Sequence, residues 1–592
     1  MTPDQIILFT LFGLVFAMLL WGRFRYDIVA FGALLVGVVL GVVPTEDAFS
    51  GFGHPATIIV ALVLVVSAGL VRSGAVYLIT RTLVDASRKL GGHIAIMGAI
   101  GGVLSAFMNN VAALALLMPV DIQTARKAGR SPGLSLMPLS FATILGGMVT
   151  LIGTPPNIII ASIREDSFGE PFAMFDFAPV GGITALAGLI FVALIGWRLI
   201  PTPDGKAAGA TLESYTDYLA ELTVPDGSKL IGKRLRELYD DAEKNDVAIL
   251  GLMRDGKRRY GTAQNSTLEA QDIIIIEAAP EALDEFRSAL NLDFTDTKRE
   301  ELLSAASDGL TVIEVVATET SRITGKTADA IGLAWRQRTV LMGLSRKGKP
   351  VKSQMRKTVI QAGDILLLLA PNDAAADVTD WLGCLPLADR GVAVTVNSKV
   401  WLAIGLFAGA VALASFGLVY LPIALGLVVM AYVLAKIVPL SELYTHIEWP
   451  VVVLLGSMIP LGAALETSGG TELIAGALVG LTEGLAPWII LTVLMVVTMT
   501  LSDVLNNTAT TIVAAPVGIQ MADSLNVSAD PFLMAVAVAA SSAFLTPIGH
   551  KNNTLILGPG GYSFGDYWRM GLPLELLVVA VSIPAILVFW PL

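Results

Sequence analysis

The sequence has little charge, few histidines and almost no cysteine. Asp, Glu, Lys and Arg make up 15% of its 592 residues, whereas an average soluble domain contains about 25%, so a chain built only of soluble domains is excluded. The net charge of −11 excludes the basic surface that nucleic-acid binding requires. The single cysteine, Cys384, excludes an internal disulfide framework. No nucleophile, metal or nucleotide motif is found, so we expect neither an enzyme nor a nucleic-acid partner.

Hydrophobic residues are abundant, and the charges are unevenly distributed. Hydrophobic types make up 54% of the chain, and residues 201–398 carry 54 of the 89 charged residues. Long apolar segments lie on both sides of that charged region. The pattern predicts two membrane blocks, 1–200 and 399–592, that are embedded in a lipid bilayer and flank a water-soluble block. The predicted fold class is an α-helical polytopic membrane protein with an inserted α/β block.

Runs of about 17 to 25 apolar residues predict membrane-spanning helices. Each membrane block contains five such runs, and between its third and fourth runs lies an apolar stretch interrupted by paired asparagines. We expect these stretches, about 93–125 and 484–522, to be re-entrant hairpins that accompany about ten spans. The predicted spans are 4–21, 27–44, 54–73, 134–163, 178–200, 399–417, 419–438, 448–467, 530–556 and 570–590.

The basic residues predict an orientation. Of the 15 Lys and Arg residues outside the central block, 13 fall on one predicted side of the membrane, and the positive-inside rule makes that side cytoplasmic. We therefore expect a multi-pass protein of the cell (inner) membrane, with both termini outside and the central block in the cytoplasm.

The two membrane blocks repeat one another at an offset of 395 to 397 residues. Chance matches between apolar segments would be Leu, Val and Ala, whereas these matches are rich in Asn, Pro, Gly and Ser. An inverted repeat with an odd number of spans is the architecture of secondary transporters. The matched positions are Pro55/Pro450, Leu70/Leu465, Ser73/Ser468, Gly74/Gly469, Ser105/Ser502, Asn109/Asn506, Asn110/Asn507, Ala112/Ala509, Pro119/Pro516, Val120/Val517, Thr150/Thr546, Ile152/Ile548, Gly153/Gly549 and Asn157/Asn553.

The repeated polar residues indicate a binding site. An asparagine in hydrocarbon costs roughly 2–7 kcal/mol unless its amide is paired. At a hairpin tip, amide oxygens and freed carbonyls can ligate a hard cation, while amide and helix N-terminal N–H groups can hold an anion. Two prolines predict that the segment 153–157 is not regular helix, so 134–163 and its counterpart 530–556 are predicted to be broken spans. Two tips and two broken spans would form one cradle for an anion and its coupling ions.

These motifs resemble a known family. Phe107-Met108-Asn109-Asn110-Val111-Ala112 and Asn506-Asn507-Thr508-Ala509-Thr510 resemble the Ser-Asn-Thr hairpin signatures of the divalent anion:sodium symporter (DASS) family, and Gly153-Thr154-Pro155-Pro156-Asn157 is similar to its first broken-helix loop. The segment 546–562 resembles the branch of sulfate and sulfur-compound permeases that carry TrkA-C domains. The resemblance implies an ion-transporter fold, a homodimer, and a transport domain that moves as an elevator against a scaffold.

By position, the resemblance also implies site residues. It implies a first sodium site from Ser105, Asn109, Asn110 and Gly153, and a second from Ser502, Asn506, Asn507 and Gly549. The substrate would lie between Asn109, Asn110, Val111, Thr154, Asn506, Asn507, Thr508 and His550.

The sequence departs from the family at four places. Asparagine stands at positions 109 and 506 where serine is usual, Val111 replaces threonine, and His550-Lys551 replaces Thr-Pro. A lysine at membrane depth costs at least ~2.5 kcal/mol unless it is paired. Lys551 either helps to bind the anion or pairs with Asp503 and partly substitutes for a cation; both alternatives leave the second sodium site open. We expect Asp121, Glu466 and Glu575 to be interfacial.

The central block contains a second repeat. Gly232-Lys233, Gly251, Lys257 and Asp272 recur as Gly325-Lys326, Gly343, Lys349 and Asp364 at an offset of 92 to 93 residues. Each unit is predicted to run strand, helix (Lys233 to Leu238 in the first), strand, turn, strand and helix. The two units, 211–290 and 305–386, resemble TrkA-C domains, which implies regulation by an unknown small ligand or bracing of a dimer.

The combined prediction is a sodium-coupled symporter for a small divalent anion, with sulfate favoured and a C4 dicarboxylate next. Proton coupling through His550 or Lys551, or an organosulfonate substrate, remains an alternative. A ligand-gated ion channel and a transceptor that binds without transport are alternatives from other classes.

Overall fold

The computed structural model separates the chain into two compact units, Met1–Thr202 with Ala393–Leu592, and Pro203–Val392. We call them the helical unit and the sheet unit. Several parts of the predicted sheet-unit boundaries, such as 211–218 and 301–309, lie outside the described residues. The structure describes residues 1–21, 24–74, 89–201, 219–238, 241–242, 247–254, 257–259, 266–277, 280–294, 310–318, 321–328, 330–333, 339–346, 349–351, 358–371, 374–387, 399–481 and 484–592.

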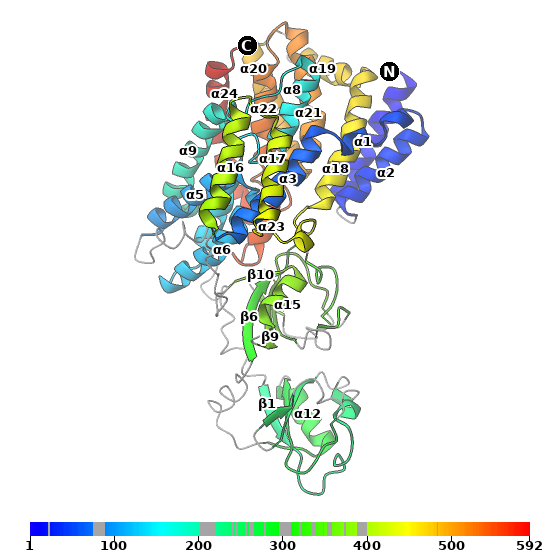
Figure 1. Ribbon diagram of the computed structural model, residues 1–592, viewed down its shortest axis with the longest axis vertical. Coiled ribbons are helices and arrows are strands. Elements are labelled where there is room, and N and C mark those ends of the chain that lie inside the picture. Colours follow the sequence, from blue (N-terminus) through cyan, green and yellow to red (C-terminus); the bar gives the residue numbers. More distant parts are fainter. Residues whose placement is uncertain are drawn as a thin grey trace. The chain divides into compact units, whose positions relative to one another are not determined.

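The first half of the helical unit contains eight described α-helices (Figure 1). Short 3-10 turns precede α3 and follow α9. The helices are α1 (Pro3–Trp21), α2 (Tyr26–Val39), α3 (Pro55–Arg72), α5 (Leu90–Phe107), α6 (Asn110–Lys127), α7 (Gly133–Gly147), α8 (Pro155–Phe168) and α9 (Ala178–Leu194).

The second half of the helical unit follows the same plan. It has a short helix between the third span and the hairpin, whereas the corresponding residues 75–88 of the first half lie outside the described residues. Its helices are α16 (Val400–Ser415), α17 (Leu421–Leu434), α18 (Trp449–Thr467), α19 (Gly470–Leu481), α20 (Pro487–Val504), α21 (Asn507–Leu525), α22 (Asp530–Ser541), α23 (Lys551–Leu557) and α24 (Tyr567–Phe589).

The helices pack into two groups. In the frame group, α18 packs on α2, and α17 packs on α3 and α16. In the hairpin group, α5 packs on α7, α20 on α22, and α24 on α9. The frame group comprises α1 to α3 and α16 to α19, and the hairpin group comprises α5 to α9 and α20 to α24. The groups meet where α21 contacts α18 and α19, and where α8 contacts α3.

The helix breaks fall at the predicted asparagines. Helix α5 ends at Phe107 and α6 begins at Asn110, while α20 ends at Val504 and α21 begins at Asn507. The repeat extends to smaller details: the Oγ of Ser73 donates to Leu70 O at 2.8 Å, and the Oγ of Ser468 donates to Leu465 O at 2.9 Å. The predicted interruption of both apolar stretches is confirmed.

The broken spans need one correction. The irregular segment lies between α7 and α8, at 148–154, and Pro155, Pro156 and Asn157 already belong to α8. The prediction that all of 153–157 is irregular is therefore wrong. The physical reason is that the first helical positions have no intrahelical partner for their N–H groups, so proline at the start of a helix removes nothing. In the second repeat the irregular segment is 542–550.

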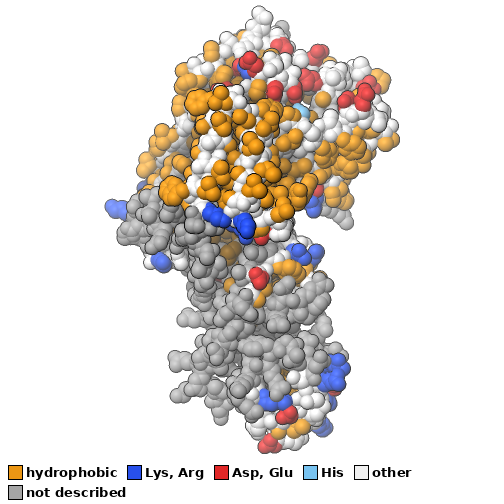
Figure 2. All heavy atoms as spheres, in the orientation of Figure 1, with side chains coloured by type: hydrophobic (Ala, Val, Ile, Leu, Met, Phe, Trp, Pro, Cys, Tyr) orange, Lys and Arg blue, Asp and Glu red, His pale blue; other side chains and the backbone are white. Residues whose placement is uncertain are grey.

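Five described helical segments are long and apolar enough to cross a membrane: Thr45–Arg72, Leu90–Phe107, Trp449–Thr467, Pro487–Val504 and Phe564–Phe589. Figure 2 shows hydrophobic side chains covering the middle of the visible face of the helical unit. On that face acidic side chains gather toward one end of the helices and basic ones toward the other.

The sheet unit contains two antiparallel five-stranded sheets with the same topology. The first has the order β3-β2-β4-β1-β5 and the second β10-β6-β9-β7-β8. Both have a register shift at the same place, between Ile249 and Gly251 and between Leu341 and Gly343. The strands are β1 (Leu219–Thr223), β2 (Ala248–Arg254), β3 (Lys257–Arg259), β4 (Ile273–Glu277), β5 (Asp293–Phe294), β6 (Leu310–Val316), β7 (Val340–Arg346), β8 (Lys349–Pro350), β9 (Ile365–Pro371) and β10 (Leu385–Pro386).

One helix follows the third long strand of each sheet, α12 (Pro280–Leu290) and α15 (Ala375–Leu382). The helix predicted at Lys233–Leu238 is only a 3-10 turn, Leu235–Leu238, because Gly232 has a positive φ and the Lys233 carbonyl oxygen accepts a hydrogen bond from Leu268 N. In each sheet an arginine donates two hydrogen bonds to a buried aspartate: Arg254 to Asp272, and Arg346 to Asp364. The bond to Asp364 raises the pKa of Arg346.

Candidate functional site

The two hairpin tips have matching side-chain contacts. The Oγ of Ser105 donates to Asn110 Oδ1 at 3.0 Å, and the Oγ of Ser502 donates to Asn507 Oδ1 at 3.0 Å. Ser105, Asn110 and Ser502 are buried. The recurrence of one contact at one distance, 397 residues apart, shows that the two tips are built alike.

The first asparagine of each pair caps the helix that follows. Asn109 Oδ1 accepts from Val111 N at 2.8 Å, and Asn506 Oδ1 accepts from Thr508 N at 2.9 Å. Asparagine is a favoured N-cap residue for this reason. The side-chain oxygens of Asn109 and Asn506 thus accept backbone N–H groups, whereas those of Asn110 and Asn507 accept serine hydroxyls. Val111 and Thr508 contribute their backbone N–H groups to these two caps.

Each irregular loop is attached to the hairpin tip of its own repeat. Thr150 Oγ1 donates to Ala106 O, and Thr546 Oγ1 donates to Asp503 O at 2.6 Å. Close packing requires the two predicted glycines. A Cβ on Gly153 would lie 2.4 Å from Gly147 O, and one on Gly549 would lie 2.8 Å from Asp503 O.

Two buried asparagines hold these loops from the helices that follow. Asn157 Nδ2 donates to Thr150 O at 2.9 Å, and Asn553 Nδ2 donates to Thr546 O at 3.2 Å. Thr154 is a buried residue at the N-terminus of α8, with no capping bond from its side chain. The loop carbonyls and the tip oxygens of each repeat are therefore held close together.

The second broken helix also reaches the first hairpin tip. His550 Nε2 lies 3.4 Å from Asn110 Nδ2, and Asn552 Nδ2 donates to Asn110 O at 3.3 Å. Helix α23 packs against α6 and α7 of the first repeat. The structure thus brings together Ser105, Asn110 and His550, which are more than 400 residues apart at their extremes.

The geometry around His550 leaves two donors facing one space. His550 Nδ1 accepts from Asn552 N at 3.1 Å, so in the neutral imidazole the proton sits on Nε2. Asn110 Oδ1 accepts from Ser105, so its NH2 group faces that Nε2–H. Two donors cannot satisfy one another, whereas one anionic oxygen can accept from both. The pair is suited to bind an anion.

Lys551 is placed differently from the prediction. It forms an ion pair with Glu448, the residue before α18, and lies over the ring of Tyr26 with Nζ 5.8 Å from the centroid. Asp503 instead accepts from Leu545 N at 2.9 Å. The expected Asp503–Lys551 pair is therefore not the pair present, because α18 presents a carboxylate to α23.

Two acidic residues expected at an interface are buried. Asp121 has no exposed surface, and Glu575 is 7% exposed. Asp121 accepts from Ser135 Oγ and contacts His93 Nε2, both at 2.6 Å. Their burial could not be read from apolar periodicity, because their partners lie on other helices.

Sequence reasoning gave no site role to Ser140, Thr143, Asn552 and Tyr562. Asn552 Nδ2 donates to Thr143 Oγ1 at 2.8 Å, and Ser140 Oγ donates to Asn553 Oδ1 at 2.9 Å. Tyr562 OH accepts from Met137 N at 2.9 Å. The signal that could have identified Asn552 is its position beside the matched Asn553, where the first repeat has Pro156.

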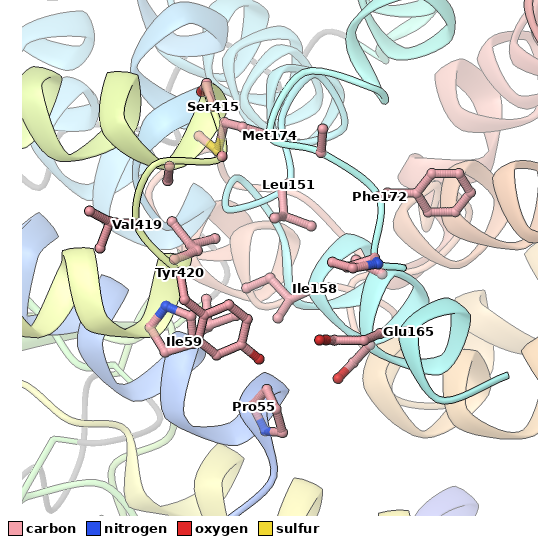
Figure 3. A pocket seen from close by; sticks show the side chains of 18 residues that line it. Pro55, Ile59, Leu151, Ile158, Glu165, Phe172, Met174, Ser415, Val419 and Tyr420 are labelled. Atoms are coloured by element: carbon pink, nitrogen blue, oxygen red, sulfur yellow. The ribbon is translucent and has the colours of Figure 1, made fainter. Parts of the chain in front are cut away.

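A cavity of about 400 Å³ lies elsewhere in the helical unit, between α3, α8 and the α16–α17 connection. Its lining is largely apolar, and Figure 3 shows the Glu165 carboxylate and the Tyr420 ring facing one another in it. None of the predicted site residues lines it. Chemistry locates the candidate site at the hairpin tips, since this cavity offers no cluster of anion donors.

Comparison with known proteins identifies the family. The sequence profile described as "Citrate transporter" matches residues 16–530 and 484–592. An uncharacterised transporter of Synechocystis sp. is 30% identical over 584 residues, 96% of this chain and 94% of that protein. A protein of Chlamydomonas reinhardtii named "Probable sodium/sulfate cotransporter 3" is 24% identical over 352 residues, 55% of this chain and 38% of its own length.

Among solved structures, the YdaH transporter of Alcanivorax borkumensis matches with a TM-score of 0.38 and 14% identity, covering 94% of this chain and 89% of that one. This resemblance is too loose to bear on the site. The family profile and the apolar helices agree with the membrane character predicted from composition. The chain is an integral membrane transporter and belongs to the citrate transporter family.

Proposed function

We propose that the protein is a sodium-coupled symporter of a small divalent anion, with sulfate favoured over a C4 dicarboxylate. The observation that carries this proposal is the position of Asn110. Its Oδ1 faces Ser105, where a cation needs oxygen ligands, and its Nδ2 faces His550, where an anion needs donors. One amide thus touches both a cation site and an anion site, so that binding of either ion favours the other.

The proposed cation ligands follow the hairpin tips. The first sodium site comprises Ser105, Asn110 and Gly153, with Asn109 as the cap that shapes the tip. The second comprises Ser502, Asn507 and Gly549, with Asn506 in the capping role. Oxygen ligands of this kind suit a hard cation.

The proposed substrate site lies between the two tips. Its donors are the amide groups of Asn110 and Asn507 and the imidazole of His550, with Val111, Thr508 and Thr154 beside them. Lys551 lies next to this site, but its ammonium group forms an ion pair with Glu448. The preference for sulfate therefore rests on similarity to a protein named as a sodium/sulfate cotransporter.

The transport mechanism proposed is an elevator. The hairpin group carries every proposed ligand, and the frame group carries none, which is the division that such a mechanism needs. We propose that the protein works as a homodimer in the cell (inner) membrane, with both termini outside. The sheet unit would then be cytoplasmic and would regulate transport or brace the dimer.

Uptake into proteoliposomes tests this function. Radiolabelled sulfate should enter in a saturable manner, show counterflow, and require an inward sodium gradient. A proton-coupled carrier would respond to a pH gradient instead of sodium, and a ligand-gated channel would show conductance without exchange. Binding without flux would indicate a transceptor. Each of these three outcomes would overturn the symport proposal.

A further inference from the structure

Among the residues that the structure describes, the buried amide oxygen of Asn552 has no hydrogen-bond partner. The residue is 0% exposed, and none of the described donors bonds its Oδ1. Buried polar groups are nearly always paired, and an unpaired one marks a place where an ion or water belongs. Asn552 is the second residue of α23, and the rest of its side chain is firmly held.

The orientation of this amide is determined by its surroundings. Nδ2 donates to Asn110 O, an atom that can only accept. It also donates to Thr143 Oγ1, whose own proton is directed to Ser140 O at 2.7 Å. Turning the amide over would place Oδ1 against two acceptors, so the oxygen is the atom left free.

The free oxygen lies at the first hairpin tip. Nδ2 and Oδ1 are bonded to the same carbon, and Nδ2 is 3.3 Å from Asn110 O. Asn110 is the residue whose side-chain oxygen accepts from Ser105 in the first proposed cation site. An amide oxygen is a neutral, hard ligand that attracts a cation and repels an anion.

We propose that Asn552 supplies a ligand to the first sodium site, so that this site is built from both repeats. The inference rests on the proposed symport and adds a residue that the repeat itself does not supply. The position equivalent to Asn552 in the first repeat is Pro156, which has no side-chain oxygen to offer the second site. The two sodium sites are therefore unequal, and the first has the additional ligand.

Sodium alone, added to the purified full-length protein, is the probe. Binding of ²²Na⁺ and the sodium-induced rise in melting temperature are measured for wild type and Asn552→Ala. The alanine variant should need at least about tenfold more sodium for half-saturation, the effect of losing one ligand to a charged partner. Thr554→Val is the matched control: Thr554 lies on the same helix, α23, and its hydroxyl, which donates to Pro547 O, is no proposed ligand.

A second variant separates a ligand from a structural amide. Asn552→Asp keeps an oxygen and loses the NH2 group that bonds Asn110 and Thr143. A ligand role predicts that it binds sodium at least as tightly as wild type; a purely structural role predicts a loss equal to that of Asn552→Ala. The latter result, or an unchanged sodium response in Asn552→Ala, overturns this inference and leaves the symport proposal standing. A wild-type protein that shows no sodium response overturns both.

Discussion

The two membrane repeats agree at their hairpin tips and differ at their broken helices. Both tips join a serine to the second asparagine at 3.0 Å and use the first asparagine as a helix cap. After the irregular loop, however, the first repeat reads Thr154-Pro155-Pro156 and the second reads His550-Lys551-Asn552. The first version starts a helix, while the second starts a helix and also bonds residues of α6 and α7.

The second broken helix makes side-chain contacts with the first repeat. His550, Asn552 and Asn553 of the second repeat contact Asn110, Thr143 and Ser140 of the first. The equivalents of Thr143 and Ser140 in the second repeat are Ala539 and Val536, which cannot return such bonds. The two repeats thus share the contacts that shape their tips and differ at the second broken helix. Symmetry accounts for the paired tips, and its loss makes the surroundings of the two tips distinct.

Removing the shared asparagines should have the largest effect. Asn110→Ala and Asn507→Ala should each lower uptake by about 100-fold or more, because a buried hydrogen bond to a charged group contributes up to ~3 kcal/mol. Uptake of labelled sulfate into proteoliposomes measures this, with size-exclusion behaviour as the control for folding. Wild-type uptake in both variants would show that the tips are only structural.

Placing alanine, the residue of the second repeat, at the equivalent glycine of the first repeat should affect the first tip alone. A Cβ on Gly147 would lie 2.5 Å from Asn110 Oδ1, whereas the equivalent position in the second repeat is already alanine, Ala543. Gly147→Ala should displace the Asn110 side chain and lower uptake by about tenfold, because a displaced amide loses ~1.4 kcal/mol of its interaction with the ions. The melting temperature should change little, because a side-chain tip moves and not the backbone.

The control for this exchange is Gly182→Ala, since Gly182 has no atom within 4 Å of an added Cβ. It should retain normal uptake. Equal losses in Gly147→Ala and Gly182→Ala would mean that α7 and α9 tolerate no alanine for reasons unrelated to Asn110.

The ion pair unique to the second repeat should have an intermediate effect. Lys551 and Glu448 join the hairpin group to the frame group, and their side chains are 29% and 25% exposed. Lys551→Met or Glu448→Gln should change the uptake rate by about three- to tenfold, since the partly exposed pair contributes only ~1 kcal/mol. The exchanged pair Glu448→Lys with Lys551→Glu should recover part of the rate. Additive losses in the exchanged pair would contradict a direct interaction.

A substitution in the sheet unit should have the smallest effect on uptake. In contrast to the membrane repeats, which differ at their broken helices, the two copies in this unit have the same strand order. Cys384 and its equivalent Leu292 are both buried, and burial raises the pKa of the Cys384 thiol to about 11. The thiol is therefore neutral at pH 8 and ionises only near the raised pKa. Maleimide should label it at pH 8 only after unfolding, as mass spectrometry can show, and Cys384→Leu should leave uptake unchanged. Rapid labelling of the folded protein would show that the thiol is accessible.

The sequence was sufficient to locate the helix breaks because asparagine and proline act locally. Asn109-Asn110 and Asn506-Asn507 lie where the helices stop, and the offset of 397 residues predicted that both tips would be alike. It was insufficient for Pro155 and Pro156, since proline interrupts a helix interior but begins a helix equally well. It also misplaced Lys551, because nothing local to α23 indicates that Glu448 lies beside it.

The sequence by itself determined the membrane blocks, the repeat, the two asparagine tips and the residue types available to bind ions. These properties depend on composition and on short-range backbone chemistry, which the chain carries wherever it is placed. Only the tertiary structure decided that the second broken helix meets the first hairpin, that Lys551 pairs with Glu448 and that the Asn552 oxygen is left free. Such contacts join residues 103 to 442 positions apart, and packing of whole helices, not local periodicity, brings them together.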